Sequence, residues 1–270
     1  MTIEYDSATT GTPALREFQE LFRYRDLLKM LVSNSIKTRY KRSALGVLWT
    51  LLNPLLNTVV LTIAFSRVLK FDVANYPVYI LSGLIFWNFF AQTTAYAMQQ
   101  LVWGSNLIKR IYVPRTIFAV SAVGNGLVNL LLALIPLALI MLAYRLPFTP
   151  ALFFLPVAVL FTGMFVLGVS LLFSTVAVFF TDLIEIYNVA LSALYFLTPI
   201  IYPESVLENY PLILKVNPIY ILLNLFRQPI IRSQVPSGME ILTGGVIGVV
   251  TLMAGWWFFT SRADEFAYRI

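Results

Sequence analysis

Two runs of polar side chains recur at helical spacing within long apolar stretches, and these are the side chains most able to do chemistry. Steps of three or four residues place each run on one face of a helix. The runs are Ser43, Gly46, Thr50, Asn53 and Asn57, and then Asn188, Ser192, Tyr195, Thr198 and Tyr202. Polar groups in apolar surroundings need water or a hydrogen-bonding partner. Two interpretations follow: the runs line a polar pore, or they join neighbouring helices by hydrogen bonds.

The composition excludes most kinds of catalysis. The chain has no cysteine and no histidine, so it offers neither thiolate nor imidazole as nucleophile, base or metal ligand. It has no Gly-x-x-x-x-Gly-Lys-Ser/Thr motif to hold the phosphates of ATP. A membrane-embedded lipid-modifying enzyme is a competing class, but only scattered carboxylates such as Asp182 and Glu185 could serve it. We expect no catalytic residue, metal site or cofactor in this chain.

The same composition predicts an all-α integral membrane protein. Of the 270 residues, 59% are hydrophobic and 12% are charged, whereas soluble domains carry about 25% charged residues. Apolar blocks long enough to cross a bilayer core of about 30 Å predict six spans, and the span interiors contain no ionisable residue. This argues against ion-driven transport, which needs charges within the membrane. The expected spans are 45–67, 78–100, 117–143, 151–180, 183–202 and 239–260; the fourth is long and the fifth marginal.

The basic residues predict the orientation. Lysines and arginines are retained on the cytoplasmic side of membranes, and placing both termini there puts 13 of the 19 on that side. Eight of them fall within residues 16–42. Nucleic-acid binding is a second interpretation of that cluster, but its position next to a span favours cytoplasmic retention. We therefore expect a multi-pass protein of the cell membrane that contacts lipid and binds no nucleic acid.

Three segments outside the spans have patterns of their own. Residues 16–42 predict an amphipathic helix along the inner leaflet, with a shift of register near Tyr24–Asp26; the alternative is a polar lead-in. Residues 104–115 predict a short helix, capped by Ser105 or Asn106 and ended by Pro114, that either transmits force from a soluble partner or anchors at the interface. Residues 203–232 predict two short helices dipping into the outer leaflet, or else a proline-rich surface loop.

Three motifs resemble one transporter family. The stretch Tyr40-Lys41-Arg42-Ser43-Ala44-Leu45-Gly46-Val47-Leu48-Trp49-Thr50-Leu51-Leu52-Asn53-Pro54-Leu55 resembles the entry to the first span of ABC-2-type exporter permeases, in the branch that exports O-antigen, capsular polysaccharide or teichoic acid. Asn106-Leu107-Ile108-Lys109-Arg110-Ile111-Tyr112-Val113-Pro114-Arg115 is similar to that family's cytoplasmic coupling helix. Leu197-Thr198-Pro199-Ile200-Ile201-Tyr202-Pro203 resembles the outer end of its fifth span. Thr181-Asp182 departs from the Arg-Asp expected after the fourth span.

The resemblance implies a homodimer that binds two copies of a separate ATP-binding subunit, which would hold ATP and Mg²⁺. It divides the chain into a cytoplasmic part (1–44) with the interface helix, a six-span domain (45–261) and a cytoplasmic tail (262–270). The coupling helix (about 104–115) would contact the ATPase through Asn106, Leu107, Lys109, Arg110, Tyr112, Pro114 and Arg115.

The resemblance also implies a path for the substrate. The first and fifth spans would line a channel with Ser43, Thr50, Asn53, Asn57, Asn188, Ser192, Tyr195, Thr198 and Tyr202. Outer gate helices (about 203–230) would include Pro203, Pro211, Asn217 and Pro218. The expected function is export of a lipid-linked, O-antigen-like polysaccharide across a bacterial inner membrane. Export of teichoic acid or capsular polysaccharide, or of a drug or lipid, is the alternative.

Overall fold

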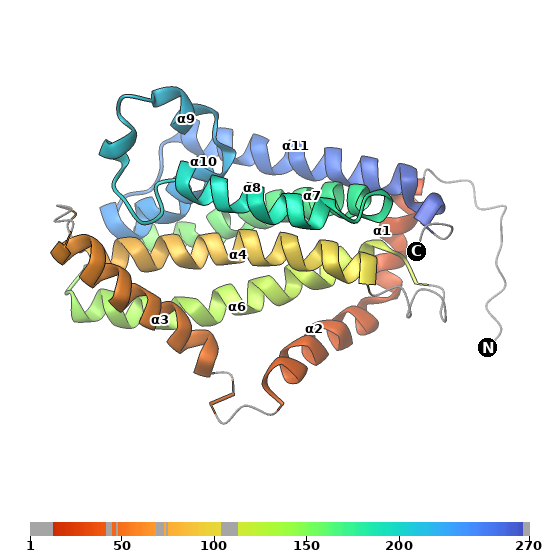
Figure 1. Ribbon diagram of the computed structural model, residues 1–270, viewed down its shortest axis with the longest axis horizontal. Helices are drawn as coiled ribbons and strands as arrows, with labels where there is room; N and C mark the ends of the chain where they lie inside the picture. The colour runs from red at the N-terminus through yellow and green to blue at the C-terminus, as the bar shows by residue number, and fades with distance from the viewer. Residues whose placement is uncertain are drawn as a thin grey trace.

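The chain folds into a bundle of long helices, shown in Figure 1. The structure, a computed structural model, describes residues 13–41, 45–46, 48–68, 73, 75–103 and 113–266. Within these residues it is helical and contains no strand, as the sequence predicted. The long helices are α3 (Leu48–Thr62, continued by a π-helical turn over Ile63–Val68), α4 (Tyr76–Trp103), α6 (Thr116–Ala143), α7 (Leu155–Phe179, preceded by a 3-10 turn over Pro150–Phe154), α8 (Leu183–Leu197) and α11 (Gly238–Arg262).

Shorter helices lie at the two ends of the bundle. At one end are α1 (Pro13–Arg23), α2 (Arg25–Tyr40) and a 3-10 turn over Ala263–Glu265; this is called the α1 end here (Figure 1). At the other, the α9 end, are α9 (Pro211–Val216) and α10 (Pro218–Arg227), with a 3-10 turn over Glu204–Leu207 and a π-helical turn over Gln228–Arg232. The short helices therefore form two separate groups, at opposite ends of the long helices.

Each of the six expected spans coincides with a described helix, but the helices differ in membrane-spanning character. Four helical segments are long and apolar enough to cross a membrane: Leu48–Phe65, Thr116–Ala143, Pro150–Phe179 and Gly238–Arg262. Helix α4 has the length, but Asn88, Gln92, Gln99 and Gln100 make it less apolar. Helix α8 has 15 residues, which at 1.5 Å per residue reach only about 22 Å. The helix expected over 183–202 therefore ends five residues early.

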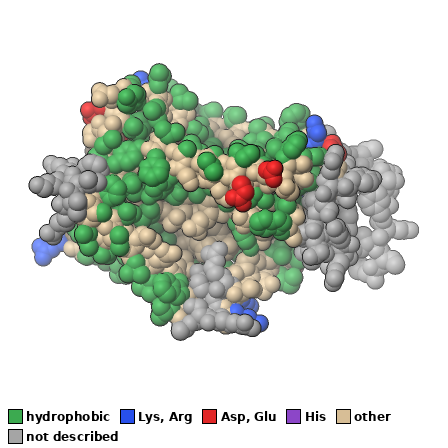
Figure 2. Space-filling view, viewed as in Figure 1, with side chains coloured by type: hydrophobic (Ala, Val, Ile, Leu, Met, Phe, Trp, Pro, Cys, Tyr) green, Lys and Arg blue, Asp and Glu red, His purple; other side chains and the backbone are tan. Residues whose placement is uncertain are grey.

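Large apolar side chains cover the outside of the bundle. Leu139 of α6, Leu160 of α7 and Met253 of α11 are each about 60% exposed or more, and Figure 2 shows hydrophobic side chains over much of one face. Soluble proteins rarely expose such extended apolar surface. An exterior of this kind fits contact with lipid tails.

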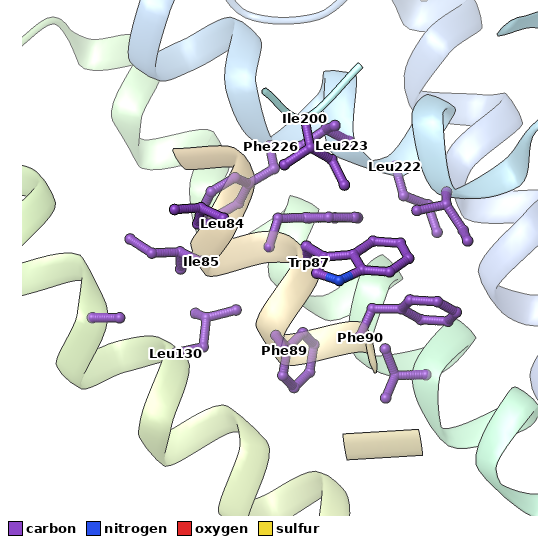
Figure 3. Close-up of a cluster of buried hydrophobic side chains, with 14 of the residues drawn as sticks. Leu84, Ile85, Trp87, Phe89, Phe90, Leu130, Ile200, Leu222, Leu223 and Phe226 are labelled. Carbon is purple, nitrogen blue, oxygen red and sulfur yellow. The ribbon is translucent and has the colours of Figure 1, made fainter. Parts of the chain in front are cut away.

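Helix α4 is the centre of the packing. It contacts α3, α6, α7, α8 and α10, and 18 of its 28 residues are buried. Aromatic rings fill much of this core. The ring centres of Trp87 and Phe90 lie 5.7 Å apart, and those of Phe86 and Phe226 of α10 lie 6.0 Å apart. Figure 3 shows the rings of Trp87, Phe90 and Phe226 in this core. Side chains on α4 therefore take their positions from all its neighbours at once.

Helices α7 and α11 approach each other through glycines. A Cβ atom added at Gly168 would lie 2.3 Å from the backbone oxygen of Thr251, and one added at Gly255 would lie 2.2 Å from the backbone oxygen of Gly168. Small residues allow such backbone contact where apolar burial gives no drive for association. The close contact between α7 and α11 therefore depends on the absence of a side chain at Gly168 and Gly255.

We expect Gly168→Ala to lower the stability of the purified protein, because overpacking against backbone costs about 1–3 kcal/mol. Gly163→Ala, on the same helix, is the matched control, since no atom lies within 4 Å of its added Cβ. The midpoint of thermal unfolding in detergent should fall for the first variant and hold or rise for the second. Equal midpoints would contradict close packing at Gly168.

Candidate functional site

Helices α1 and α2 pack against the long helices at the α1 end. Leu21, Leu27 and Leu31 contact a buried cluster that includes Ile117, Leu171 and Phe259. The indole Nε1 of Trp256 on α11 donates to the backbone oxygen of Ala14 at 3.2 Å. The predicted shift of register is confirmed, because α1 ends at Arg23 and α2 begins at Arg25. Contacts with the long helices therefore fix the positions of α1 and α2.

A carboxyl group ties α1 to the start of α6. The hydroxyl of Thr116 donates to Oε2 of Glu17 at 2.7 Å. Burial raises the pKa of the Glu17 carboxyl above its ordinary value, and the bond from Thr116 opposes that shift. Thr116 directly follows the segment expected to couple to a partner. A displacement of Thr116 would therefore strain its hydrogen bond to Glu17 and act on α1.

The expected coupling segment is described only in its last residues. Asn106, Leu107, Lys109, Arg110 and Tyr112 lie outside the described residues. Pro114 is buried and lies two residues before the start of α6, and the guanidinium of Arg115 lies 5.8 Å from the ring centre of Phe266. Both residues lie at the α1 end, beside α1 and the C-terminal turn.

A chain of hydrogen bonds runs from α2 into the bundle. The hydroxyls of Ser35 and Tyr96 lie 3.2 Å apart, and Gln100 Nε2 donates to the Tyr96 oxygen at 2.7 Å. On α6, the hydroxyl of Ser121 donates to Oε1 of Gln100 at 3.3 Å. These bonds connect α2, α4 and α6, and a shift of α2 must strain or break them.

The polar run on the first span faces a cavity. Thr50 and Asn53 line a cavity of about 410 Å³ between α3, α4 and α6. Asn57 Nδ2 donates to Asn53 Oδ1 at 2.6 Å, so these two amides bond along one face of α3. Ser43 lies outside the described residues.

The polar run on the fifth span is divided by the end of α8. Asn188 and Ser192 are exposed, and the Ser192 hydroxyl donates to the Asn188 backbone oxygen at 3.1 Å. Tyr195 packs edge-on against Trp87, with ring centres 5.3 Å apart. Thr198 and Tyr202 lie beyond the helix. Because α3 packs on α4 and α6 while α8 packs on α4 and α7, the two runs approach α4 from different sides (Figure 1).

The residues expected at the outer gate begin short helices. Pro203 precedes the 3-10 turn at Glu204, Pro211 is the first residue of α9, and Pro218 is the first of α10. Proline suits this place, because a helix start leaves its N–H unused. The Asn217 side chain caps α10 by accepting from the N–H groups of Ile219 and Tyr220, and its Nδ2 donates to the Thr198 hydroxyl at 2.9 Å.

One arginine binds the irregular backbone of turns and bends that follows α8. Arg227 is 4% exposed and donates to the backbone oxygens of Pro199 at 2.6 Å, Ile200 at 2.8 Å and Tyr79 at 3.1 Å. Its guanidinium carbon lies 3.9 Å from the centre of the Tyr79 ring. Gly83 makes room for it, because an added Cβ would lie 2.2 Å from the guanidinium. Five donor groups in a planar fork suit several carbonyls at once.

Two groups of residues escaped the reasoning from sequence. No role was predicted for Arg227, although it is a single cation within the apolar stretch 218–231. The amide side chains that line the cavity together with Thr50 and Asn53 were also not predicted. They recur at four-residue steps, the spacing of one helix face, which could have revealed them: Asn88 and Gln92 on α4, and Asn125 and Asn129 on α6.

We expect Arg227→Met to destabilise the protein strongly, since each buried carbonyl left without its partner costs about 1–3 kcal/mol. Arg232→Met is the control, because that exposed arginine makes only a 3.8 Å pair with Glu204, a type of contact that contributes roughly 0–1 kcal/mol. Thermal unfolding in detergent measures both. The role assigned to Arg227 fails if the two variants unfold at the same temperature.

Comparisons with known proteins agree with this arrangement. Residues 26–231 match the family model described as ABC-2 type transporter. The chain is 31% identical over 260 residues to an O-antigen export system permease protein, RfbA, of Myxococcus xanthus, covering 95% of this chain and 100% of that one. It is 29% identical to an RfbA of Klebsiella pneumoniae (72% and 76% covered), and 21% identical to the polysialic acid transport protein KpsM of Escherichia coli (88% and 93% covered).

The family match spans most of the chain, including α2, the cavity helices and Arg227. It stops before α11, which the Myxococcus xanthus relative nevertheless covers. The chain belongs to the ABC-2 type transporter family of membrane proteins.

Proposed function

We propose that this chain is the membrane permease of an ABC exporter that moves a lipid-linked, O-antigen-like polysaccharide across a bacterial inner membrane. The observation that carries the proposal is the match along the whole length of the O-antigen export permease of Myxococcus xanthus. An apolar exterior and at least four membrane-spanning helices support it. ATP and Mg²⁺ would be bound by a partner subunit, and this chain would supply the path.

The proposed topology has six spans with both termini in the cytoplasm. Helix α4 is the second span, since its polar residues are turned toward neighbouring helices and the cavity. Helix α8 is the fifth, and its 15 residues are extended by the segment 198–202, whose carbonyls find partners within the protein. Irregular backbone is tolerated at membrane depth under that condition.

The proposed complex contains two copies of this chain and two ATP-binding subunits. The ATPase would dock at the α1 end, on α1, α2 and the 104–115 segment. Two observations support this end. Glu17 joins α1 to the first residue of α6, and the Ser35–Tyr96–Gln100 bonds join α2 to the bundle. A push on the surface elements would reach the long helices through these contacts.

The proposed channel forms between the two copies, lined by the polar runs of α3 and α8. Asn188 and Ser192 are exposed in the single chain, and a second copy could complete their surroundings. The short helices after Pro203 would form the outer gate, hinged on the Asn217–Thr198 bond. The match to a polysialic acid transport protein favours capsular polysaccharide as the second candidate substrate.

We expect charge reversal of Lys109, Arg110 and Arg115 to uncouple ATP hydrolysis from export, because these cations would face the ATPase. The complex with the reversed charges should still hydrolyse ATP, while the cells lose surface polysaccharide. The purified chain alone should hydrolyse no ATP. Arg145→Glu is the control, being exposed at the opposite end of α6. Normal export by the triple variant would contradict the docking site, and ATP turnover by the isolated chain would overturn the division of labour.

Cysteine labelling tests the channel, and the absence of native cysteine leaves no background. Asn57→Cys and Tyr195→Cys should react with a water-soluble maleimide at rates that change when the partner binds ATP. Leu139→Cys, which is 60% exposed on the apolar surface, should react slowly in both states. If Asn57→Cys and Tyr195→Cys behave like Leu139→Cys, these positions face lipid and the channel assignment is wrong.

A further inference from the structure

The cavity between α3, α4 and α6 is built unlike the rest of the bundle. It measures about 410 Å³, within the range of roughly 300–1,000 Å³ typical of small-molecule sites. Its walls carry eight uncharged polar side chains on three helices: Thr50, Asn53, Asn88, Gln92, Thr93, Tyr96, Asn125 and Asn129. So much hydrogen-bonding capacity is costly inside an apolar bundle unless something uses it.

The amides on α6 bond to no other protein group in the part of the chain that the structure describes. Asn125 is only 5% exposed, yet within the described residues neither its side chain nor that of Asn129 hydrogen-bonds to a protein group. On α4, Gln92 and Asn88 are joined by a single bond of 3.4 Å. Buried polar groups in native proteins are almost always paired. The Asn125 and Asn129 side chains, which bond to no described protein group, are therefore available to an occupant.

The chemistry of the walls selects the class of occupant. Among the described residues that line the cavity there is no Asp, Glu, Lys or Arg, so it offers no ion pair to a phosphate or a carboxylate. Side-chain amides both donate and accept, which matches hydroxyl groups that also do both. Trp49, Phe89 and Tyr96 add aromatic faces for apolar C–H surfaces. A ring bearing several hydroxyls on a C–H framework satisfies all three features.

We propose that this cavity binds neutral sugar units of the exported polysaccharide, within one copy of the chain and beside the channel assigned to α3 and α8, with which it shares Thr50 and Asn53. The inference rests on the proposed function and adds a subsite to it. Thr50 and Asn53 belong to both surfaces, so a sugar leaving the cavity would meet the polar face of α3 directly. The cavity runs from Trp49 and Tyr96 near the α1 end to Ile85 and Ala133 deeper in the bundle.

Tyr96 gives the cavity a connection to the proposed ATPase side. Tyr96 lines the cavity, and its hydroxyl lies 3.2 Å from that of Ser35 on α2 and accepts from Gln100 Nε2. A sugar hydroxyl bonded to Tyr96 would compete with Ser35. Occupation of the cavity and the position of α2 are therefore linked through one side chain.

Photo-crosslinking in cells tests the proposal. A benzophenone amino acid replaces Asn129 in a strain that carries the partner ATPase and synthesises the polysaccharide, and the purified permease is probed with an antibody against that polysaccharide. The same amino acid at Leu131, which is 58% exposed two residues further along α6, is the matched control. We expect an adduct at position 129, none at 131, and loss of the adduct in a strain that makes no polysaccharide.

Three results would overturn the proposal. An adduct at 129 that persists without polysaccharide shows that lipid or another molecule fills the cavity. An adduct with the probe at Tyr195 but none at 129 leaves the proposed function intact and removes the cavity from the path. If neither position gives an adduct, the cavity proposal fails, and deletion of the gene decides the function: polysaccharide export that continues without this chain removes the proposed function too.

Paired substitutions separate binding from a structural role. Asn125→Leu with Asn129→Leu should lower export roughly tenfold or more, the loss of about two neutral hydrogen bonds. The midpoint of thermal unfolding should hold or rise, because the substitutions remove two amide groups from an apolar bundle. Leu139→Ala, on the lipid-facing side of α6, should leave export unchanged. A fall in thermal stability, or export at the unsubstituted level, would overturn the assignment.

Discussion

The pairing of backbone carbonyls after α8 is the constraint on which the α9 end depends. The helix stops at Leu197, and in an apolar environment the freed carbonyls of the next residues must find partners within the protein. They do: Arg227 binds the oxygens of Pro199 and Ile200, Tyr76 binds Ile201, and Tyr79 binds Pro199 and Tyr202. The desolvated charge of Arg227 is tolerated because carbonyl dipoles and the Tyr79 ring surround it.

Helix α4 connects that constraint to the rest of the molecule. Its first turns carry Tyr76, Tyr79 and Gly83, which hold Arg227 and the irregular segment after α8. Its middle faces the polar cavity, and its last turns bond to α2 and α6 through Tyr96 and Gln100. Buried on nearly all sides, α4 has little freedom to bend alone. It is thus a physical link between the proposed ATPase side and the proposed gate.

Much of the fold could be predicted from periodicity and composition. The apolar blocks located the long helices, since few charges and a length near that of a bilayer leave few other folds. The shift of register near Tyr24–Asp26 coincides with the break between α1 and α2, and short helices were expected within residues 203–232, where α9 and α10 lie. The fifth span was expected to be marginal, and α8 ends at Leu197, because Thr198 and Tyr202 continue a helical spacing that the backbone does not follow.

The sequence by itself determined that this is an all-helical membrane protein without cysteine or histidine, because composition and spacing are local properties. Only the tertiary structure decided which polar residues meet. It turned Thr50 and Asn53 toward the amides of α4 and α6, and it brought Arg227 to carbonyls 27 and 28 residues away. The reason is physical: a polar side chain in an apolar bundle binds whichever group packing places beside it, and no spacing along one helix reveals that neighbour.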